Sequence, residues 1–210
     1  MLDAAAKGFD ALVFDIGGVI VSHDNEAMYR QIASRCAGSP PTQEVKAVIR
    51  RTRWSLGLEP MSSLHERLQT ELGYDGDWSR FVEDWTCHFT ADRSMAALAA
   101  GLARTQRVIL FSNTNAVHGA HEIPGMEELA EVERCLSCDL GLVKPAPEAF
   151  LKVAELAGID PRRSLMIDDL PENVRGAQEA GFQGLLFQGE AELRQALLEA
   201  GVVIGEGEPA

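Results

Sequence analysis

Four short runs of apolar residues constrain the fold of this chain more than any other feature of its sequence. They cover residues 11–14, 108–111, 165–167 and 184–187, and three of them end directly at Asp15, Ser112 and Asp168. The runs are continuous rather than alternating, which indicates strands buried on both faces, as in a parallel sheet covered by helices. Helical patterns separate them, and several begin with Pro or an acidic residue and end before Gly: 95–104, 147–157, 171–180 and 190–200. The sequence therefore predicts an α/β fold with a Rossmann-like, doubly wound parallel sheet.

Residues 25–92 depart from this alternation. Their pattern predicts four helices separated by Gly- and Pro-containing segments, over residues 25–36, 42–56, 61–72 and 78–89. A bundle of helices inserted after the first strand is the simplest description. We therefore expect a core built from residues 1–22 and 93–204, a helical insertion over residues 23–92, and a disordered tail over residues 205–210.

Composition narrows the classes of partner. The 210 residues, of which 46% are hydrophobic, suffice for one core with a smaller lid. A formal net charge of −13 argues against binding to nucleic acid or to an anionic membrane, because both reward Lys and Arg. No apolar run approaches the ~18 residues of a membrane-spanning helix, and no signal peptide is apparent, so we expect a cytoplasmic protein. Without a heptad pattern, a monomer and a homodimer both stay open.

Polar side chains follow the predicted strands at the points where they end. Because ligands bind beyond the carboxyl ends of the strands in open parallel sheets, we expect Asp15, Ser112 and the Asp168-Asp169 pair to converge. Three carboxylates held together repel one another unless a hard cation lies between them. Oxygen ligands of this kind suit Mg²⁺, which keeps several positions for water and substrate phosphate. The sequence therefore predicts a magnesium site.

Two further residues fit the chemistry of phosphoryl transfer. Lys144, in the segment Gly-Leu-Val-Lys-Pro, can offset the charge of a phosphoryl group, while the Ser112 hydroxyl and nearby backbone N–H groups donate to its oxygens. Asp15 leaves the first strand beside a Gly-Gly loop whose small residues let a substrate approach. It can act as a nucleophile that forms an aspartyl-phosphate.

These segments, in this order, resemble the signature of the haloacid dehalogenase superfamily: a nucleophilic Asp, a Ser or Thr, a Lys and an acidic pair. The resemblance extends over nearly the whole chain. It implies that Asp15 attacks phosphorus and that the metal ligands are Asp15, the backbone carbonyl of Gly17 and Asp169, with Asp168 binding directly or through water. It further implies that Asn173 supports this loop by hydrogen bonding.

The resemblance also has implications for substrate binding. The helical insertion resembles the type-1 cap of the family, which closes over the site and selects substrates. The segment Ser112-Asn113-Thr114-Asn115 with His118 resembles members that act on sugar phosphates. The residues expected to contact the substrate are Gly17, Gly18, Asn113, Asn115 and His118.

One position departs from the family pattern. Most phosphatases of the family carry a second Asp, the general acid–base group, where this chain has Gly17. Losing such a group typically costs ~10²–10⁴-fold in rate. A sugar 1-phosphate needs less protonation of its leaving group, and His23, Asp24 or His118 could act through a water molecule. The leading hypothesis is a Mg²⁺-dependent phosphatase of a small phosphorylated metabolite, with a sugar 1-phosphate favoured.

Two alternatives stay open. In a 2-haloacid dehalogenase, Asp15 would displace halide without a metal. Such enzymes usually carry Tyr-Gly-Thr where this chain has Gly17-Gly18-Val19, and the adjacent acidic residues favour a metal. The other alternative is a catalytically weak relative that binds a phosphorylated ligand or a protein partner, a reading that rests on Gly17.

The remaining candidates have structural interpretations. Cys135 and Cys138 are expected to be small core residues with free thiols, since no second pair completes a metal site. Trp54, Trp78 and Trp85 are expected to form the core of the insertion, and one of them could stack on a sugar or base ring.

Overall fold

A five-stranded parallel sheet forms the centre of the molecule in the computed structural model, which describes residues 8–121 and 126–204. The strand order is β5-β4-β1-β6-β7, and every neighbouring pair is parallel. The strands are β1 (Ala11–Phe14), β4 (Arg107–Ser112), β5 (Glu133–Leu136), β6 (Ser164–Asp168) and β7 (Gln183–Leu186). The predicted fold class is confirmed. The predicted disordered tail, residues 205–210, lies outside the described residues.

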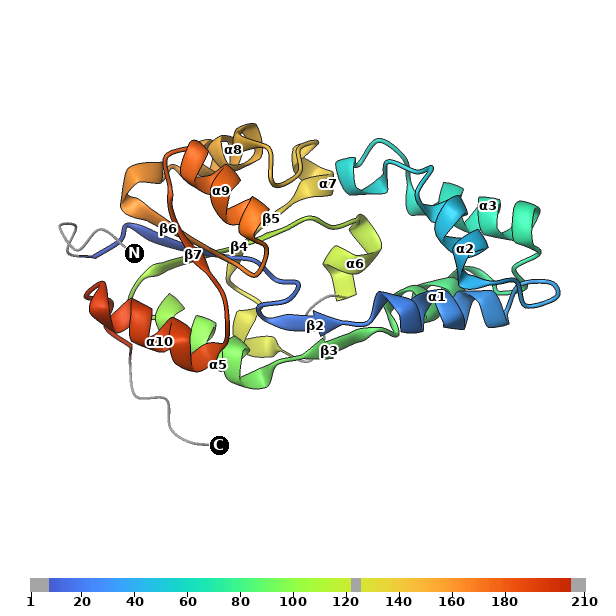
Figure 1. Cartoon of the computed structure of the whole chain (residues 1–210), viewed down its shortest axis with the longest axis horizontal. Helices are drawn as coiled ribbons and strands as arrows, with labels where there is room; N and C mark the ends of the chain where they lie inside the picture. Colours follow the sequence, from blue (N-terminus) through green and yellow to red (C-terminus); the bar gives the residue numbers. More distant parts are fainter. Residues whose placement is uncertain (1–7, 122–125, 205–210) are drawn as a thin grey trace.

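Helices cover both faces of this sheet. One face carries α8 (Pro147–Ala157) and α9 (Pro171–Glu179), and the other carries α5 (Arg93–Ala103) and α10 (Glu190–Glu199) (Figure 1). Side chains of β1 alternate between the two layers, because Leu12 and Phe14 pack in the cluster with α5 and α10 while Val13 packs in the cluster with α8 and α9. Burial on both faces explains the continuous apolar runs that predicted the sheet.

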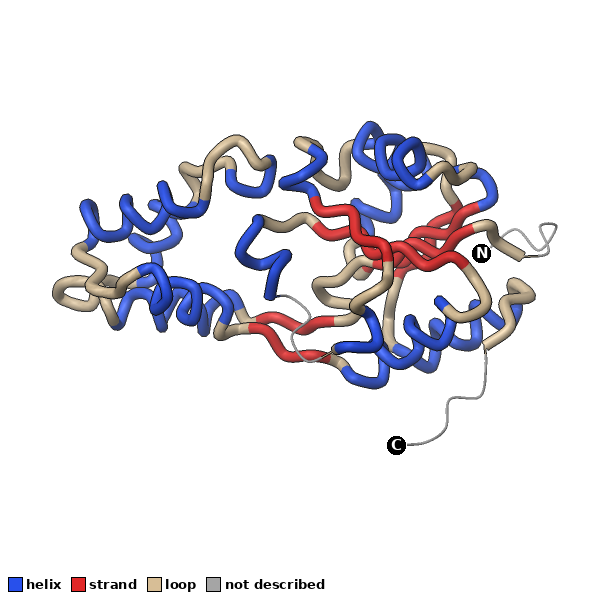
Figure 2. The backbone as a smooth tube through the Cα atoms, turned by 180° about the vertical axis from the view of Figure 1, so that it is seen from behind, coloured by secondary structure: helices blue, strands red, loops and turns tan. Residues whose placement is uncertain are grey.

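Four further helices lie apart from the sheet: α1 (Asn25–Ser34), α2 (Thr42–Ile49), α3 (Met61–Leu72) and α4 (Trp78–Thr86). We call them the insertion helices. They bury a separate apolar cluster that includes Ile32, Leu64 and Phe81. Figure 2 shows this helical group and the sheet at opposite ends of the molecule, with a pair of short strands running between them.

That strand pair was missed by the sequence analysis. β2 (Val21–His23) pairs antiparallel with β3 (Phe89–Ala91), so the helix predicted over 78–89 ends earlier, at Thr86. The partners are far apart in the sequence, and a local helical pattern carries no signal for such pairing. The helix predicted over 42–56 was also too long. It ends at Ile49, whose carbonyl accepts the Thr52 hydroxyl at 2.6 Å, and a separate 3-10 turn, η1 (Trp54–Leu56), follows.

Short helices complete the described chain. They are α6 (Ala116–His121), η2 (Glu127–Leu129), α7 (Ser137–Leu140) and η3 (Pro161–Arg163). All four cysteines are free, but the prediction that both thiols of the 135–138 segment lie in the core was wrong for Cys138. Cys135 is buried on β5, whereas Cys138 is partly exposed because the chain turns into α7 directly after the strand. No helix within the described residues is long and apolar enough to cross a membrane.

Candidate active site

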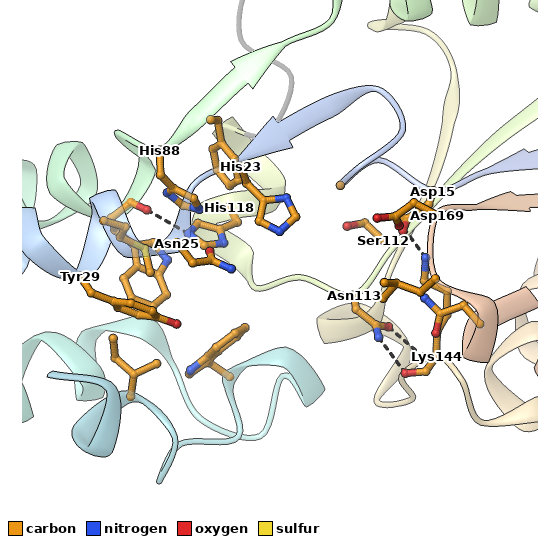
Figure 3. A pocket seen from close by; sticks show the side chains of 18 residues that line it. Asp15, His23, Asn25, Tyr29, His88, Ser112, Asn113, His118, Lys144 and Asp169 are labelled. Carbon is orange, nitrogen blue, oxygen red and sulfur yellow. Dashed lines mark hydrogen bonds and ion pairs between the residues drawn. The ribbon is translucent and has the colours of Figure 1, made fainter. Parts of the chain in front are cut away.

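The carboxyl ends of the central strands bring three carboxylates together. Asp15 follows β1, Asp168 ends β6, and Asp169 comes next in the chain. Carboxylate oxygens from these three residues lie within 4.8 Å of one another. Ser112, at the end of the neighbouring strand β4, is buried beside them (Figure 3). The residues that the sequence placed at strand ends therefore form one cluster, as the topology of a parallel sheet requires.

Lys144 lies within this cluster. Its ammonium nitrogen is 2.9 Å from Asp15 Oδ1 and 2.7 Å from Asp168 Oδ2, and it donates to the Phe111 carbonyl at 3.0 Å. The residue is only 3% exposed. Burial alone acts to lower the pKa of Lys144, but the charges of Asp15 and Asp168 outweigh it and hold that pKa above its ordinary value. Lys144 is therefore a permanent cation inside the protein.

One buried cation does not balance three carboxylates. Burial raises the pKa of Asp15 to about 7, with the charge of Asp168 adding to the rise and Lys144 opposing it. Burial and the neighbouring Asp168 also raise the pKa of Asp169. These shifts mean that the ionised cluster is held at a cost in free energy. Carboxylate oxygens are also the donors that hard divalent cations prefer, so the cluster fits Mg²⁺ in both charge and ligand chemistry.

Two asparagines position the charged groups. Asn113 forms a pair of hydrogen bonds with the backbone of Lys144, donating to its carbonyl and accepting from its N–H, both at 2.8 Å. Asn173, in the first turn of α9, donates to both oxygens of Asp168 at 2.9 and 3.1 Å. This contact matches the support expected of Asn173. Asn113, expected to touch substrate, lines the cavity described below but directs its amide to the lysine loop.

The Gly17-Gly18 loop approaches the carboxylates closely. Gly18 has a φ of +78°, and a Cβ atom built there would lie 2.2 Å from Asp169 Oδ2, so only glycine fits. At Gly17 a Cβ atom would lie 3.6 Å from the Nδ1 and Cε1 atoms of His23, which is ordinary contact. The His23 imidazole therefore stands beside the direction in which a side chain at position 17 would project.

A cavity of about 340 Å³ joins this charged cluster to the insertion helices. At one end are Asp15, Ser112, Lys144 and Asp169. The other end is lined mainly by apolar and aromatic residues, which are Met28, Tyr29, Ile49, Trp54, Trp85, His88, Phe89 and His118. Figure 3 shows labelled members of the two groups on opposite sides, with His23 projecting from the aromatic side toward the charged one.

The structure separates the remaining candidates. His118 lines the cavity, and its Nε2 atom donates to the Trp85 carbonyl at 3.0 Å. Burial lowers the pKa of His118 to about 3, so it is neutral at pH 7. Asn115 is fully buried and caps α6 by accepting from the N–H groups of residues 117 and 118 at 3.0 Å. Asn115 is not among the residues that line the cavity and its side-chain oxygen is used for capping, so its contact with substrate stays a prediction. Asp24 is exposed and caps α1 through the Ala27 N–H.

The three tryptophans of the insertion differ in burial. Trp85 is buried in the apolar cluster of the insertion helices and half-buried Trp54 packs on it, whereas Trp78 is 43% exposed and does not belong to that core. Tyr29, His88 and Phe89 line the cavity but were not singled out from the sequence. The β2–β3 pairing places His88 and Phe89 at the cavity, and a local sequence pattern does not reveal such a pairing.

Comparison with known proteins places the chain in a family of hydrolases. Residues 9–181 match the family model described as haloacid dehalogenase-like hydrolase, and the chain belongs to that family. It is similar to the D-ribitol-5-phosphate phosphatase of Bacteroides thetaiotaomicron, with 26% identity over 199 residues that cover 89% of this chain and 95% of the relative. It is 39% identical to flavin mononucleotide hydrolase 1 of Arabidopsis thaliana over 66 residues, which are 31% of this chain and 27% of that protein.

Solved structures agree with the fold. A haloacid dehalogenase family enzyme of Bacteroides thetaiotaomicron, crystallised with magnesium and inorganic phosphate, superposes with a TM-score of 0.76. The similarity covers 87% of this chain and 96% of that enzyme at 24% sequence identity.

Proposed function

We propose that this protein is a Mg²⁺-dependent phosphatase that hydrolyses a small phosphate monoester through an aspartyl-phosphate on Asp15. The observation that carries the proposal is the placement of the Asp15 carboxylate beside the buried Lys144 cation and the Asp168-Asp169 pair, at the polar end of the cavity. Two relatives named for hydrolysis of phosphate esters support it, one acting on ribitol 5-phosphate and one on flavin mononucleotide.

The carboxylate cluster would hold the metal. Asp15, Asp169 and the Gly17 carbonyl are the proposed ligands, with Asp168 binding directly or through water. When bound, Mg²⁺ supplies positive charge that offsets both the carboxylates and the phosphoryl oxygens. Asn173 keeps Asp168 in one orientation through its two hydrogen bonds. Asn113 does the same for the backbone that carries Lys144.

The reaction uses this chain's residues in two steps. The Asp15 carboxylate attacks phosphorus, the P–O bond to the alcohol breaks, and the alcohol oxygen leaves with a proton. Lys144, the Ser112 hydroxyl and loop N–H groups stabilise the negative charge on the transferred phosphoryl oxygens. Water then attacks the aspartyl-phosphate, which releases inorganic phosphate and restores the Asp15 carboxylate.

We assign proton transfer at the leaving group to His23. Gly17 cannot supply it, Asp24 caps a helix, and His118 is committed to the Trp85 carbonyl. His23 lines the cavity and its ring lies next to the position of a side chain at residue 17. Histidine is the most frequent general acid–base in enzymes and can act through one water molecule. A sugar 1-phosphate, whose leaving group needs little protonation, is the favoured substrate.

The two alternatives have less support. Among the described residues that line the cavity there is no arginine to hold the carboxylate of a 2-haloacid. A ligand-binding protein without turnover needs neither a nucleophile nor a buried lysine poised between carboxylates, and this chain has both.

Intact-mass spectrometry of an acid-quenched reaction tests the covalent step. With acetyl phosphate and Mg²⁺, the wild-type protein is expected to gain the mass of one phosphoryl group, mapped by peptide analysis to Asp15. The Asp15→Asn variant should gain none. Phosphate release without any adduct on the wild type, or an adduct on another residue, contradicts the assignment.

A further inference from the structure

Building on the proposed function, we infer that the alcohol part of the substrate is uncharged and carries a ring that lies against one aromatic surface of the cavity. This surface, the aromatic wall, consists of Tyr29, Trp54, Trp85, Phe89 and His118. Two of its members, Tyr29 and His118, lie across the cavity from the phosphate-binding end (Figure 3), where the non-phosphate part of a bound ester must extend.

Among the residues that the structure describes, the aromatic end of the cavity, beyond His23, offers no cation to pair with a second anionic group. Within the described part of the chain, Lys144 is the one Lys or Arg that lines the cavity, and two carboxylates already bind its ammonium. Burial lowers the pKa of His88 to about 4 and that of His118 to about 3, so both imidazoles are neutral at pH 7. A carboxylate or second phosphate placed there would be buried without a partner, which is costly.

The aromatic wall is a continuous surface. Trp85 stacks on His118 with ring centroids 4.9 Å apart and planes 22° apart. Trp54 meets Trp85 edge to face at 6.0 Å, and Phe89 meets His118 edge to face at 4.8 Å. Trp85 is stacked between His118 and Phe81 and therefore holds the wall in place, while the half-buried rings of Tyr29, Trp54 and Phe89 offer the surface on which a substrate ring stacks. A short aliphatic alcohol would leave most of that surface uncovered.

Two hydrogen-bond donors at this surface lack acceptors. The indole Nε1 atoms of Trp54 and Trp85 are buried and have no partner among the described residues. Trp85 is only 1% exposed. Both nitrogens are closed off from the cavity, so the wall contributes to ligand binding through its ring surfaces rather than through hydrogen bonds. A cavity of about 340 Å³ also has the size of sites for ring-bearing small molecules.

Three phosphate esters separate the effect of a second charge on kcat/KM from the effect of a ring. Benzyl phosphate carries an uncharged ring, 4-carboxybenzyl phosphate adds one negative charge to it, and propyl phosphate has no ring. We expect kcat/KM for benzyl phosphate to exceed that for each of the others by about tenfold or more, because an unpaired buried charge and a lost stacking surface each weaken binding. Glucose 1-phosphate in the same panel shows whether a sugar ring is preferred to an aromatic one. Equal values for benzyl, 4-carboxybenzyl and propyl phosphate overturn the inference.

Matched tryptophan variants locate the effect. Trp54→Leu is expected to lower kcat/KM for benzyl phosphate about tenfold while changing that for propyl phosphate less than about twofold, since only the former uses the ring. Trp54→Phe retains a ring and should therefore keep most of the kcat/KM for benzyl phosphate, with a loss of less than about threefold. Trp78→Leu, in the same helical group but outside the cavity lining, should change none of these values. Equal losses for both esters in Trp54→Leu contradict a role in recognition.

Binding separates this inference from the reaction itself. Calorimetric titration with benzylphosphonate, 4-carboxybenzylphosphonate and propylphosphonate in Mg²⁺ buffer needs no turnover. Preferential binding of benzylphosphonate without hydrolysis of any ester upholds the inference and overturns the proposed phosphatase reaction. Hydrolysis of all esters with no preference in binding does the reverse.

Discussion

Asp15 is the nucleophile of the proposed reaction, and burial of its ionised carboxylate also lowers the stability of the folded protein. It is buried beside one cation and two further carboxylates, and its pKa is raised from 3.8 to about 7, chiefly by burial. Between these two values the folded protein binds more protons than the unfolded chain. Its stability therefore falls as pH rises through this window, and the full cost is present above pH 7.

Replacing this carboxylate with an amide should stabilise the metal-free protein. For Asp15→Asn we expect a free energy of unfolding about 1–3 kcal/mol above that of the wild type at pH 8, with the difference shrinking as the pH falls toward 4. Urea denaturation in chelator at several pH values measures it. Saturating Mg²⁺ should narrow the gap at pH 8 by stabilising the wild type. A variant that is less stable than the wild type at pH 8 would contradict this account of the site.

His23 is the proposed general acid, and it lies beside the position where Gly17 lacks a side chain. His23→Asn should slow hydrolysis of alkyl phosphates about 10²-fold or more, and should affect acetyl phosphate much less, because a good leaving group needs little protonation. Adding Gly17→Asp should restore most of the loss, since a side chain fits at position 17 in ordinary contact with the residue at 23. Steady-state kinetics of the single and double variants on both substrates tests this. Equal losses on both substrates in His23→Asn would show that His23 is not the acid.

Secondary-structure elements determine how much of the site the sequence can predict. Asp15, Ser112 and Asp168 were predictable because each ends a buried strand, and parallel topology brings such ends together. Lys144 and Asn173 were placed by the order of motifs. The aromatic wall was predicted in part, since His118 and a stacking tryptophan were named from the sequence. Tyr29 and Phe89 were not, because their places depend on β3 pairing with β2 and on how the insertion helices pack over the sheet. Asn115 shows the converse, since a motif residue turned out to cap α6.

The first turn of α9 supplies a test at this scale. Asn173→Ala removes both hydrogen bonds to Asp168 and leaves the metal-binding loop without its support. We expect the Mg²⁺ concentration for half-maximal activity to rise about 10–100-fold, with a smaller change in kcat at saturating metal. Glu179→Ala, exposed near the end of the same helix, is the matched control. An unchanged Mg²⁺ requirement in Asn173→Ala would remove Asn173 from the metal site.

In the whole molecule, the cavity exists because the insertion helices rest against the sheet domain at defined contacts. Ser137, at the start of α7, donates its hydroxyl to the Ser55 carbonyl of η1 at 2.7 Å. Gly57 follows η1 with a φ of +66°, and a Cβ atom there would lie 2.0 Å from the Cys138 carbonyl oxygen. This close approach holds Trp54 at the cavity, so the contact between the two parts bears on substrate binding as well as on stability.

Gly57→Ala should disturb that contact. We expect a loss of about 1–3 kcal/mol in stability, because the side chain meets both an unfavourable φ and a backbone carbonyl. kcat/KM for benzyl phosphate should fall more than that for propyl phosphate. Gly101→Ala, in α5 with open space around its Cβ position, is the control and should be neutral or slightly stabilising. Thermal unfolding and kinetics together measure the effect, and an equal outcome for the two variants would show that the η1–α7 contact is dispensable.

Release of inorganic phosphate reports turnover, the metal requirement and the role of Asp15 in one experiment. The wild-type protein is incubated with acetyl phosphate, glucose 1-phosphate and benzyl phosphate, in Mg²⁺ and in chelator, beside the Asp15→Asn variant. We expect phosphate release that requires Mg²⁺ and disappears in the variant. Release that persists in chelator or in Asp15→Asn, or no release from any of the three, would contradict the proposed function.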